Sequence, residues 1–426
     1  MLPGRFRVHN AEPAPGNVLS PSRLVLESAT IPLLGSAPLS SLVNPASNVV
    51  IAFTDTTRPS PDQVLVSLLR RELAEAGVPP HNITLLCATG LHRPITEEEL
   101  LTKLGPENLQ GVRVVNHDAT NPGQLADLGT INGIPAIVNR LCAEADLVLA
   151  TGIVEPHQYA GFSGGAKTVT IGCGGEETIR QTHGVNMLDR EGTTLGSLHG
   201  NSFQEFVRKA AERAGLQYIL NVVLNRSGGI LAAACGNPAQ VHDHLSTLAL
   251  DYGSVAIPRP VHIAIAGVPP AKAANLYQAS RAATYLGLAA HTPLLPGAPI
   301  VLPAALPEGP GDGTGEQRFF RILSEAPSPS ALVRRLRQEG FPAGAQRAYV
   351  LARLLCRHPV IVAGAECPDV VRDCHMTAAP TLEAALDIAE AIARSTFDLP
   401  QSEKPELLYV ENGLTTLVRL AETSKA

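Results

Sequence analysis

The sequence predicts an α/β protein of two domains, each built on a parallel sheet. Two observations carry this prediction: short continuous apolar runs alternate with helical patterns along the chain, and polar loops follow directly after several of these runs. Strands of a parallel sheet are covered by helices on both faces, so they read as continuous apolar runs. The length of 426 residues fits two or three domains at roughly 150 residues each.

The first unit contains four predicted strands with helices between them. A helical pattern covers about 61–76, and Thr96 followed by three glutamates marks the start of a second helix. Open parallel sheets bind ligands at the carboxyl ends of their strands, so the polar loops at those ends are the first candidates for a site. The predicted strands are 48–53, 83–88, 112–115 and 146–150.

A second unit is expected to begin near 257–260, where the sequence IPRP interrupts the pattern. The final stretch, 406–422, contains a strand-like LLYV followed by a helical pattern, and its residues alone fit either unit. The same alternation recurs between these two segments, which again indicates an α/β unit. The predicted strands are 261–266, 299–302 and 359–363, and the predicted helices are 279–290, 315–324, 329–353 and 381–394.

Composition and charge exclude several classes of protein. Lys plus Arg number 33 against 39 Asp plus Glu, so no basic surface is expected for a nucleic-acid backbone. No apolar stretch approaches the length of a membrane span, and residues 1–5 lack the pattern of a secretory signal. The seven cysteines are scattered without a CxxC pair, which fits a reducing cytoplasm and argues against a disulfide framework or a zinc finger.

A glycine-rich segment, GFSGGAKT at 161–168, resembles a phosphate-binding loop. Glycines let backbone N–H groups approach an anion, and a following helix N-terminus favours negative charge. A Walker A loop needs Gly immediately before the Lys, and Ala166 occupies that position. A phosphate-loop nucleotide-dependent enzyme therefore stays open as an alternative function, and an ordinary glycine-rich turn with a solvated Lys167 is the simpler interpretation of this segment alone.

Three histidines lie in loops or helix ends beside predicted strand ends: His92, His157 and His183. A single loop histidine is more often a surface residue than a catalyst, but three at one rim of a sheet favour function. Imidazole transfers protons near neutral pH and ligates borderline transition metals. His117 can also be read as a metal ligand, whereas His242 and His244 are expected to be solvated.

Two further groups of side chains could bind anions. Asp55 and Arg58 follow the first predicted strand, where Asp55 can equally form an Asx turn or a helix cap. Tyr277, Gln278 and Arg281 lie near the start of the first helix of the second unit. An arginine fork at a helix N-terminus suits a carboxylate, although an ordinary amphipathic helix start explains the same pattern.

Taken together, the motifs resemble those of the nickel-dependent lactate racemase family. The resemblance covers most of residues 50–290 and is weaker towards the C-terminus. It rests on the whole set and on the His–x9–Lys–x15–His spacing more than on any one motif. The motifs, in chain order, are DTTRP at 55–59, ATGLHRP at 88–94, NHD at 116–118, EPHQYAGFSGGAK at 155–167 and QTHG at 181–184.

The resemblance implies a nickel pincer nucleotide, a nicotinic-acid-derived mononucleotide with two sulfur donors, as the cofactor. Lys167 matches the residue that tethers it covalently through a thioamide, and His183 matches the nickel ligand. His92 and His157 match the two catalytic histidines. Asp55, Gly164 and Gly165 match positions around the cofactor, and Arg58, Tyr277, Gln278 and Arg281 are the expected substrate-binding residues.

The activity implied by the resemblance is racemisation or epimerisation of a small 2-hydroxy acid. A hydride passes reversibly to the cofactor, and one histidine on each side of the carbon exchanges the hydroxyl proton. Cofactor biosynthesis proteins are then expected as maturation partners. The family fold places the site in the cleft between two domains, with the C-terminal segment returning to the first. This gives domains of 1–256 plus 400–426 and 257–399.

The sequence departs from the family pattern at two points. Arg281 stands where the family's lactate racemase has Lys, and the chain has no Trp where that enzyme has one near the substrate. A missing indole leaves room for a larger or polyhydroxylated substrate. Besides the nucleotide-dependent enzyme, two rivals are a zinc hydrolase, which leaves Lys167 unexplained and lacks an HExxH cluster, and a non-catalytic cofactor carrier, which requires the loss of a catalytic histidine.

Overall fold

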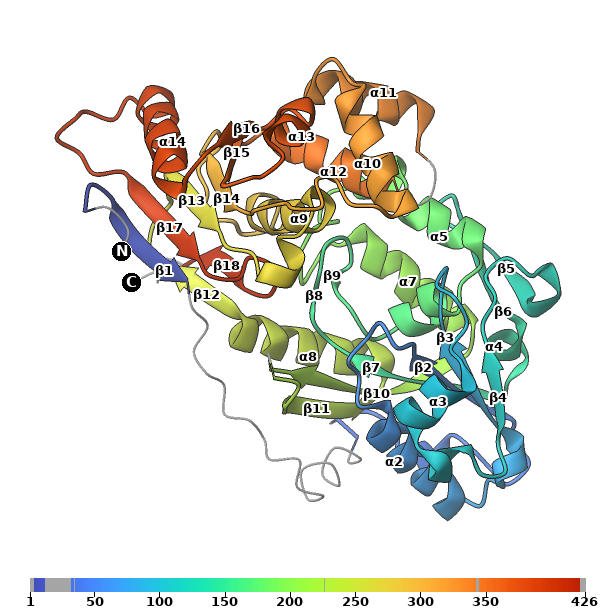
Figure 1. The fold of residues 1–426 in the computed structure, drawn as a ribbon. Helices are drawn as coiled ribbons and strands as arrows, with labels where there is room; N and C mark the ends of the chain where they lie inside the picture. The colour runs from blue at the N-terminus through green and yellow to red at the C-terminus, as the bar shows by residue number, and fades with distance from the viewer. Residues whose placement is uncertain (1–3, 12–31, 34, 226, 342–344, 422–426) are drawn as a thin grey trace.

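The computed structural model describes residues 4–11, 32–33, 35–225, 227–341 and 345–421. It contains two α/β units, each built around a six-stranded sheet (Figure 1). The α/β class and the predominance of parallel strands are therefore confirmed. No helix in the described part of the chain has the length and apolar character needed to cross a bilayer.

The first sheet is parallel except for its last strand. Its strand order is β11-β10-β7-β2-β3-β4, and β11 alone runs antiparallel to its neighbour. The predicted strands of this unit are confirmed, whereas β10 and β11 were not predicted. The strands are β2 (Val49–Thr54), β3 (Ile83–Ala88), β4 (Arg113–Asn116), β7 (Leu147–Ile153), β10 (Leu216–Leu224) and β11 (Ile230–Gly236).

The order in which successive strands join the sheet reverses beside β2. The chain adds β3 and β4 on one side of β2 and then returns to add β7 and β10 on the other. Thr54 pairs with Ala88 in the register of β2 and β3, so these strands end at the same level. The loops after β2 and β7 diverge at this switch point, which is where open α/β sheets form their ligand crevice.

Helices and two small hairpins cover the first sheet. Thr96 and Glu99 form a capping box that starts α3, as the sequence predicts. The helices are α2 (Asp62–Glu75), α3 (Glu97–Leu104), α4 (Arg140–Glu144), α5 (Glu176–Thr182), α6 (Val185–Leu188), α7 (Ser202–Arg213) and α8 (Pro238–Gly253). The hairpins pair β5 (Leu125–Ile131) with β6 (Ile134–Asn139) and β8 (Pro156–His157) with β9 (Gly161–Phe162).

The second sheet is parallel throughout, in the order β1-β17-β13-β14-β15-β16. Its strands are β1 (Arg7–Ala11), β13 (Ile263–Ala266), β14 (Ile300–Pro303), β15 (Val360–Ala363), β16 (Thr377–Ala379) and β17 (Glu406–Val410). Its helices are α9 (Leu276–Gly287), α10 (Thr314–Ser324), α11 (Pro329–Glu339), α12 (Gln346–Leu355), α13 (Pro368–Asp373) and α14 (Leu382–Thr396).

The C-terminal segment differs from its prediction. The expected domain 1–256 plus 400–426 places it with the first unit, but β17 lies inside the second sheet between β1 and β13. Its apolar run, ELLYV, is almost wholly buried, which a central parallel strand requires. The helix expected after it is instead β18 (Leu417–Leu420), which pairs with β12 (Ser254–Ile257) at the junction of the units. Residues 422–426, at the end of that expected domain, lie outside the described residues.

The helix predicted over 329–353 is two helices. Gly340, with φ +71°, ends α11, because only glycine adopts this left-handed conformation without strain, and α12 starts at Gln346. The remaining predicted helices and strands of the second unit are present with end positions shifted by a few residues.

Polar contacts around Asp189 join the two units directly. The Asp189 carboxylate, at the end of α6, accepts hydrogen bonds from Arg337 Nε and Tyr349 Oη, each at 2.7 Å. Arg353 Nη1 donates to the Leu188 carbonyl beside it at 2.7 Å. Helices α11 and α12 are therefore fastened to α6, and the second unit is held over the switch point of the first sheet.

Candidate active site

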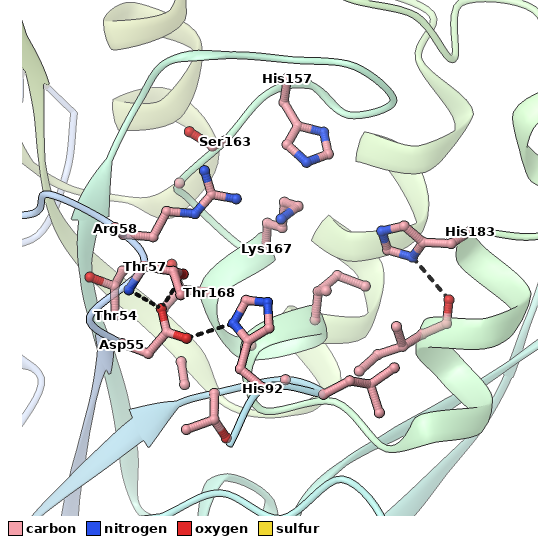
Figure 2. Close-up of a pocket in the computed structure, with 18 of the residues that line it drawn as sticks. Thr54, Asp55, Thr57, Arg58, His92, His157, Ser163, Lys167, Thr168 and His183 are labelled. Carbon is pink, nitrogen blue, oxygen red and sulfur yellow. Dashed lines mark hydrogen bonds and ion pairs between the residues drawn. The ribbon is translucent and has the colours of Figure 1, made fainter. Parts of the chain in front are cut away.

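A cavity of about 510 Å³ lies at the carboxyl ends of β2, β3 and β7, under the second unit. Figure 2 shows side chains from the loops that follow these strands pointing into it. Most of its lining comes from the first unit, and Phe341 and Gln346 contribute from the second. The cavity contains most of the predicted site residues, namely Asp55, Arg58, His92, His157, Gly164, Lys167 and His183.

Asp55 and His92 form a hydrogen-bonded pair across two adjacent strand ends. His92 Nδ1–H donates to Asp55 Oδ2 at 2.6 Å, and Thr57 donates from its backbone N–H and hydroxyl to Asp55 Oδ1 (Figure 2). Burial raises the pKa of the Asp55 carboxyl, but the hydrogen bonds from His92 and Thr57 outweigh it and hold this pKa below its usual range. The ionised carboxylate fixes the His92 tautomer, so Nε2 presents a lone pair and can accept a proton.

His157 has the opposite tautomer. The backbone N–H groups of Tyr159 and Ala160 lie 3.3 and 3.2 Å from His157 Nδ1, and they can only donate to it. In the neutral ring the proton is therefore on Nε2, which can donate a hydrogen bond. Burial, followed by the charges of Lys167 and Arg58, holds the pKa of His157 well below its usual value, so the ring is neutral at physiological pH.

The GFSGGAKT loop brings Lys167 to the cavity. Gly164 and Gly165 both have positive φ. A Cβ on Gly164 would lie 2.7 Å from the Ile153 carbonyl oxygen, and one on Gly165 would lie 2.6 Å from the His242 ring. Glycine is therefore required at both positions. Asn221 Oδ1, on β10, accepts from the Gly165 N–H at 2.8 Å and fixes the loop to the sheet.

Lys167 is buried beside Arg58, and its amine approaches neutrality. Burial, and after it the charge of Arg58, lower the pKa of Lys167 to about 7. Arg58 itself forms an ion pair with Glu155 at 2.7 Å. An unprotonated amine is a nucleophile, so Lys167 can form a covalent bond to an electrophilic carbon near physiological pH.

His183 follows α5 and presents one free ring nitrogen. Its Nδ1–H donates to the Ile179 carbonyl at 2.9 Å (Figure 2), which leaves the Nε2 lone pair available. Burial, and after it the charge of Lys167, lower the pKa of His183 to about 4. A neutral imidazole oriented by a hydrogen bond to a backbone carbonyl is a typical metal ligand. Lys167 and His183 are thus the residues that could hold a cofactor and its metal.

The predicted substrate-binding residues of the second unit lie outside the cavity lining. Tyr277, Gln278 and Arg281 are on the first turns of α9. Arg281 Nη2 donates to Tyr285 Oη at 2.7 Å. Tyr277 and Arg281 nevertheless lie on the same face of α9 as Thr284, whose Oγ1 is 3.4 Å from Gln158 Nε2 of the first unit.

Other histidines have structural positions. His242 was expected to be solvated but is buried: its Nε2–H donates to the Ser163 carbonyl at 3.0 Å, beneath the glycine loop. Helical periodicity alone gave no sign that α8 packs under this loop. His117 has both ring nitrogens occupied, by the Gly174 carbonyl and the Asn139 amide. A metal-binding function for His117 is therefore not supported.

Sequence reasoning missed two supports of the site. Glu155 stands in the EPHQYAG motif, and its acidic side chain beside two histidine motifs was a usable signal for the ion pair with Arg58. Asp62 is fully buried, accepts hydrogen bonds from hydroxyls of Thr54 and Thr151, and pairs with Lys103 at 2.9 Å. This network ties α2 and α3 to the strand ends beneath the cavity.

The geometry gives little support to two alternative functions, the phosphate-loop nucleotide-dependent enzyme and the zinc hydrolase. The glycine loop leads into a five-residue π-helical turn, Thr168–Gly172, whereas a phosphate-binding loop leads into a full α-helix. Within the described ranges, no group of three or more His, Cys, Asp or Glu side chains is arranged to hold a metal ion.

Comparison with known proteins identifies the family. The lactate racemase N-terminal domain model matches residues 12–196, and the lactate racemase C-terminal domain model matches residues 261–401. The lactate racemase of Lactiplantibacillus plantarum is 31% identical over 410 residues, which cover 95% of this chain and 92% of the relative. The lactate racemase of Thermoanaerobacterium thermosaccharolyticum is also 31% identical, over 91% of this chain and 88% of the relative.

Solved structures agree. The lactate racemase apoprotein from T. thermosaccharolyticum superposes with a TM-score of 0.79 at 27% identity, covering 93% of this chain and 92% of the other. A Thermotoga maritima protein, 20% identical, shares the fold with a TM-score of 0.58 over 88% of this chain and 93% of its own. The two domain models and the two relatives show that the chain belongs to the lactate racemase family and is an isomerase.

Proposed function

We propose that this protein racemises or epimerises a 2-hydroxy acid with a nickel pincer nucleotide attached to Lys167. The observation that carries the proposal is that one cavity holds a near-neutral Lys167 amine and three histidines with assigned tautomers. His92 and His183 have a free Nε2 lone pair, whereas His157 has its proton on Nε2. A phosphate-loop enzyme leaves these histidines without a function, whereas the proposal uses all three.

The residues present fit such a cofactor. Lys167 offers an amine that can form the thioamide bond, and His183 offers Nε2 as a nickel ligand. Gly164 and Gly165 allow the turn that brings Lys167 to the cavity, because a Cβ at either position would clash with the protein packed against the loop. When bound, the cofactor supplies an electrophilic carbon that accepts a hydride from C2 of the substrate and returns it.

The histidines exchange the hydroxyl proton. His92 Nε2 accepts it from one enantiomer, while the Asp55 carboxylate stabilises the imidazolium that forms. In the other enantiomer the hydroxyl lies towards His157. That ring accepts the proton after its own proton has moved to Nδ1, which requires release of the hydrogen bonds from Tyr159 and Ala160.

Arg58 is placed to bind the substrate carboxylate. Its guanidinium points into the cavity between His157 and Lys167 (Figure 2), and its ion pair with Glu155 holds it there. A fork of N–H donors matches a carboxylate. Tyr277, Gln278 and Arg281 approach the same substrate from α9 when the second unit closes. Phe341 offers an aromatic face to the cavity from the second unit.

Maturation and location follow from the same residues. Lys167 lies beneath the second unit, so attachment of the cofactor requires the cleft to open to the biosynthesis proteins. All seven cysteines are free thiols, which fits the reducing cytoplasm as the place of action.

The proposal is tested on protein matured in cells that make the cofactor. We expect an added mass on the peptide that contains Lys167, about one nickel per chain, and interconversion of the enantiomers of a 2-hydroxy acid. Lys167→Ala should lose the added mass and the activity, whereas His244→Ala, at an exposed histidine, should keep both. Full activity with an unmodified Lys167 would overturn the covalent assignment.

A further inference from the structure

A pair of arginines on the second unit has no acidic partner. Arg281 and Arg347 form no ion pair with any carboxylate in the described part of the chain. Arg281 stacks on Tyr285 with its Cζ 5.3 Å from the ring centroid, and Arg347 stacks on Tyr277 at 4.3 Å. Aromatic faces thus provide the attraction that carboxylates usually provide.

The two arginines are neighbours, because Arg347 stacks on Tyr277, which lies one helical turn before Arg281 on α9. Burial, and after it the charge of Arg281, lower the pKa of Arg347. Arg281 Nε is buried without a hydrogen-bond partner, and so is Gln278 Oε1 on the same helix. Buried polar atoms without partners are costly, and two enclosed like charges are costlier still. An anionic ligand between them would satisfy both.

The pair lies one side chain away from the catalytic histidines. The charges of Arg281 and Arg347 both act on the Tyr159 hydroxyl. The Tyr159 ring in turn packs edge-on against His157 and His183, at centroid distances of 5.8 and 5.7 Å. Gln346, next to Arg347 at the start of α12, lines the cavity itself.

A monocarboxylate does not need this much positive charge. Arg58 already lies at the first-unit side of the cavity, where it can hold the carboxylate next to C2. The arginine pair is on the opposite side, on α9 and α12. A substrate that engaged both sides would need an anionic group at each end.

We propose that the preferred substrate is a 2-hydroxy acid with a second anionic group, which Arg347 and Arg281 bind from the second unit. This inference rests on the proposed function, because it names the substrate class of the same site. Arg347 is then a specificity-determining residue. The second anion can be a carboxylate, a phosphate or a sulfonate, which all accept the arginine fork.

The test measures binding by calorimetry with the full-length apoprotein and with the cofactor-loaded protein. The probes are lactate, 2-hydroxysuccinate, 3-phosphoglycerate and 3-sulfolactate, which vary only the second group. We expect at least one dianion to bind about tenfold or more tightly than lactate. Its affinity should also fall more steeply with added salt, because it uses more charge pairs.

Arg347→Gln should lower the affinity for the best probe with a second anionic group by about 10- to 100-fold, the range of a charge-assisted hydrogen bond of roughly 1.5–3 kcal/mol. The loss of affinity for lactate should be at least tenfold smaller. Arg347→Lys keeps the charge but not the fork and should fall between. It also serves if the Gln variant does not fold. Arg372→Ala, at an exposed ion pair on α13, is the matched control and should bind like the parent.

The inference fails if the parent binds lactate as tightly as the three probes with a second anionic group, or if Arg347→Gln weakens the binding of all four probes equally. Dianion preference without turnover of any 2-hydroxy acid by the loaded protein would instead sink the proposed function and leave the anion site standing. Racemisation of lactate without a preference for ligands with a second anionic group would support the proposed function and overturn the anion site.

Discussion

The cleft has a first wall, formed by the first unit, and a second wall, formed by the second unit. The two walls balance their positive charges in different ways. On the first unit, each basic group of the site has a carboxylate within reach or is close to neutral: His92 donates to Asp55, Arg58 pairs with Glu155, and the pKa of Lys167 is about 7. On the second unit, the arginines rest on tyrosine rings instead. The first wall is complete by itself and suits proton transfer. In the described part of the chain, the arginines of the second wall have no acidic partner until an anionic ligand binds.

Under the proposed function, this difference assigns proton transfer to the first wall and substrate binding to the second. Groups that move protons need fixed tautomers, which the first-unit hydrogen bonds provide. Groups that select a substrate gain most when their charges are unsatisfied in the free protein, since binding then relieves a cost. Substitutions on the two walls should therefore have different signatures, in turnover on one side and in affinity on the other.

The largest effect is expected at His92 and His157, the proposed acid–base groups of the first wall. His92→Ala and His157→Ala should each lower racemisation by about 10²- to 10⁴-fold, the usual contribution of a positioned acid or base, with little change in KM. Steady-state kinetics on the best 2-hydroxy acid measures this. His244→Ala is the exposed control. Parent-like rates in either variant would remove that histidine from the mechanism.

A pH-dependent change in stability is expected at Lys167. Below pH about 7 the amine is protonated in both the folded and the unfolded apoprotein. Between about 7 and its usual value of 10.5, only the unfolded state holds the proton, so the free energy of unfolding should rise with pH. Each pKa unit corresponds to about 1.4 kcal/mol.

Lys167→Met lacks this titration, so its stability advantage over the parent should shrink as the pH rises from 7 to 10. Urea unfolding of both apoproteins across this range measures the difference. A difference in free energy of unfolding that stays constant with pH would show that the pKa of Lys167 is not lowered. The description of the charges on the first wall would then be wrong.

The contact between the walls should have an intermediate effect. Asp189→Ala removes the acceptor of Arg337 and Tyr349, which fasten α11 and α12 to α6. We expect the cleft to open more often, with KM raised about tenfold and a larger radius of gyration in solution scattering. Asp369→Ala, at an exposed pair on α13, is the control. Unchanged scattering would mean that apolar packing alone holds the units together.

The smallest effect on stability is expected at Arg58. Its ion pair with Glu155 is more than a third exposed on both sides, and such pairs contribute about 0–1 kcal/mol. Arg58→Ala should leave the urea midpoint nearly unchanged while raising KM. A strong loss of stability would assign Arg58 a structural function and weaken its assignment to the substrate carboxylate.

Local features of this molecule were predictable, and long-range ones were not. The runs at 48–53 and 83–88 are continuous and apolar because β2 and β3 are buried on both faces, and the loops behind them carry Asp55 and His92. Lys167 and His183 could be found because the family motif fixes their spacing. These signals lie within a few residues of one another.

The missed features depend on partners far along the chain. LLYV reads as a strand, but nothing in it says that β17 joins the second sheet. The stretch read as a helix after it is β18, whose pairing with β12 overrides the local pattern. Arg347 resembles an ordinary polar residue of an amphipathic helix, and only its place opposite Arg281 reveals a cation pair.

The pairing of β1 with β17 sets an order for synthesis. His9 and Glu406, joined at 2.6 Å, are 397 residues apart, so the second sheet encloses the whole first unit as an insertion between its own strands. The first sheet is complete once β11 has emerged from the ribosome, whereas the second also needs β17, which is synthesised much later. Domains usually fold as units in the order of synthesis. The first unit is therefore expected to fold while β1 is still unpaired, and the cleft forms only after β17 has been synthesised.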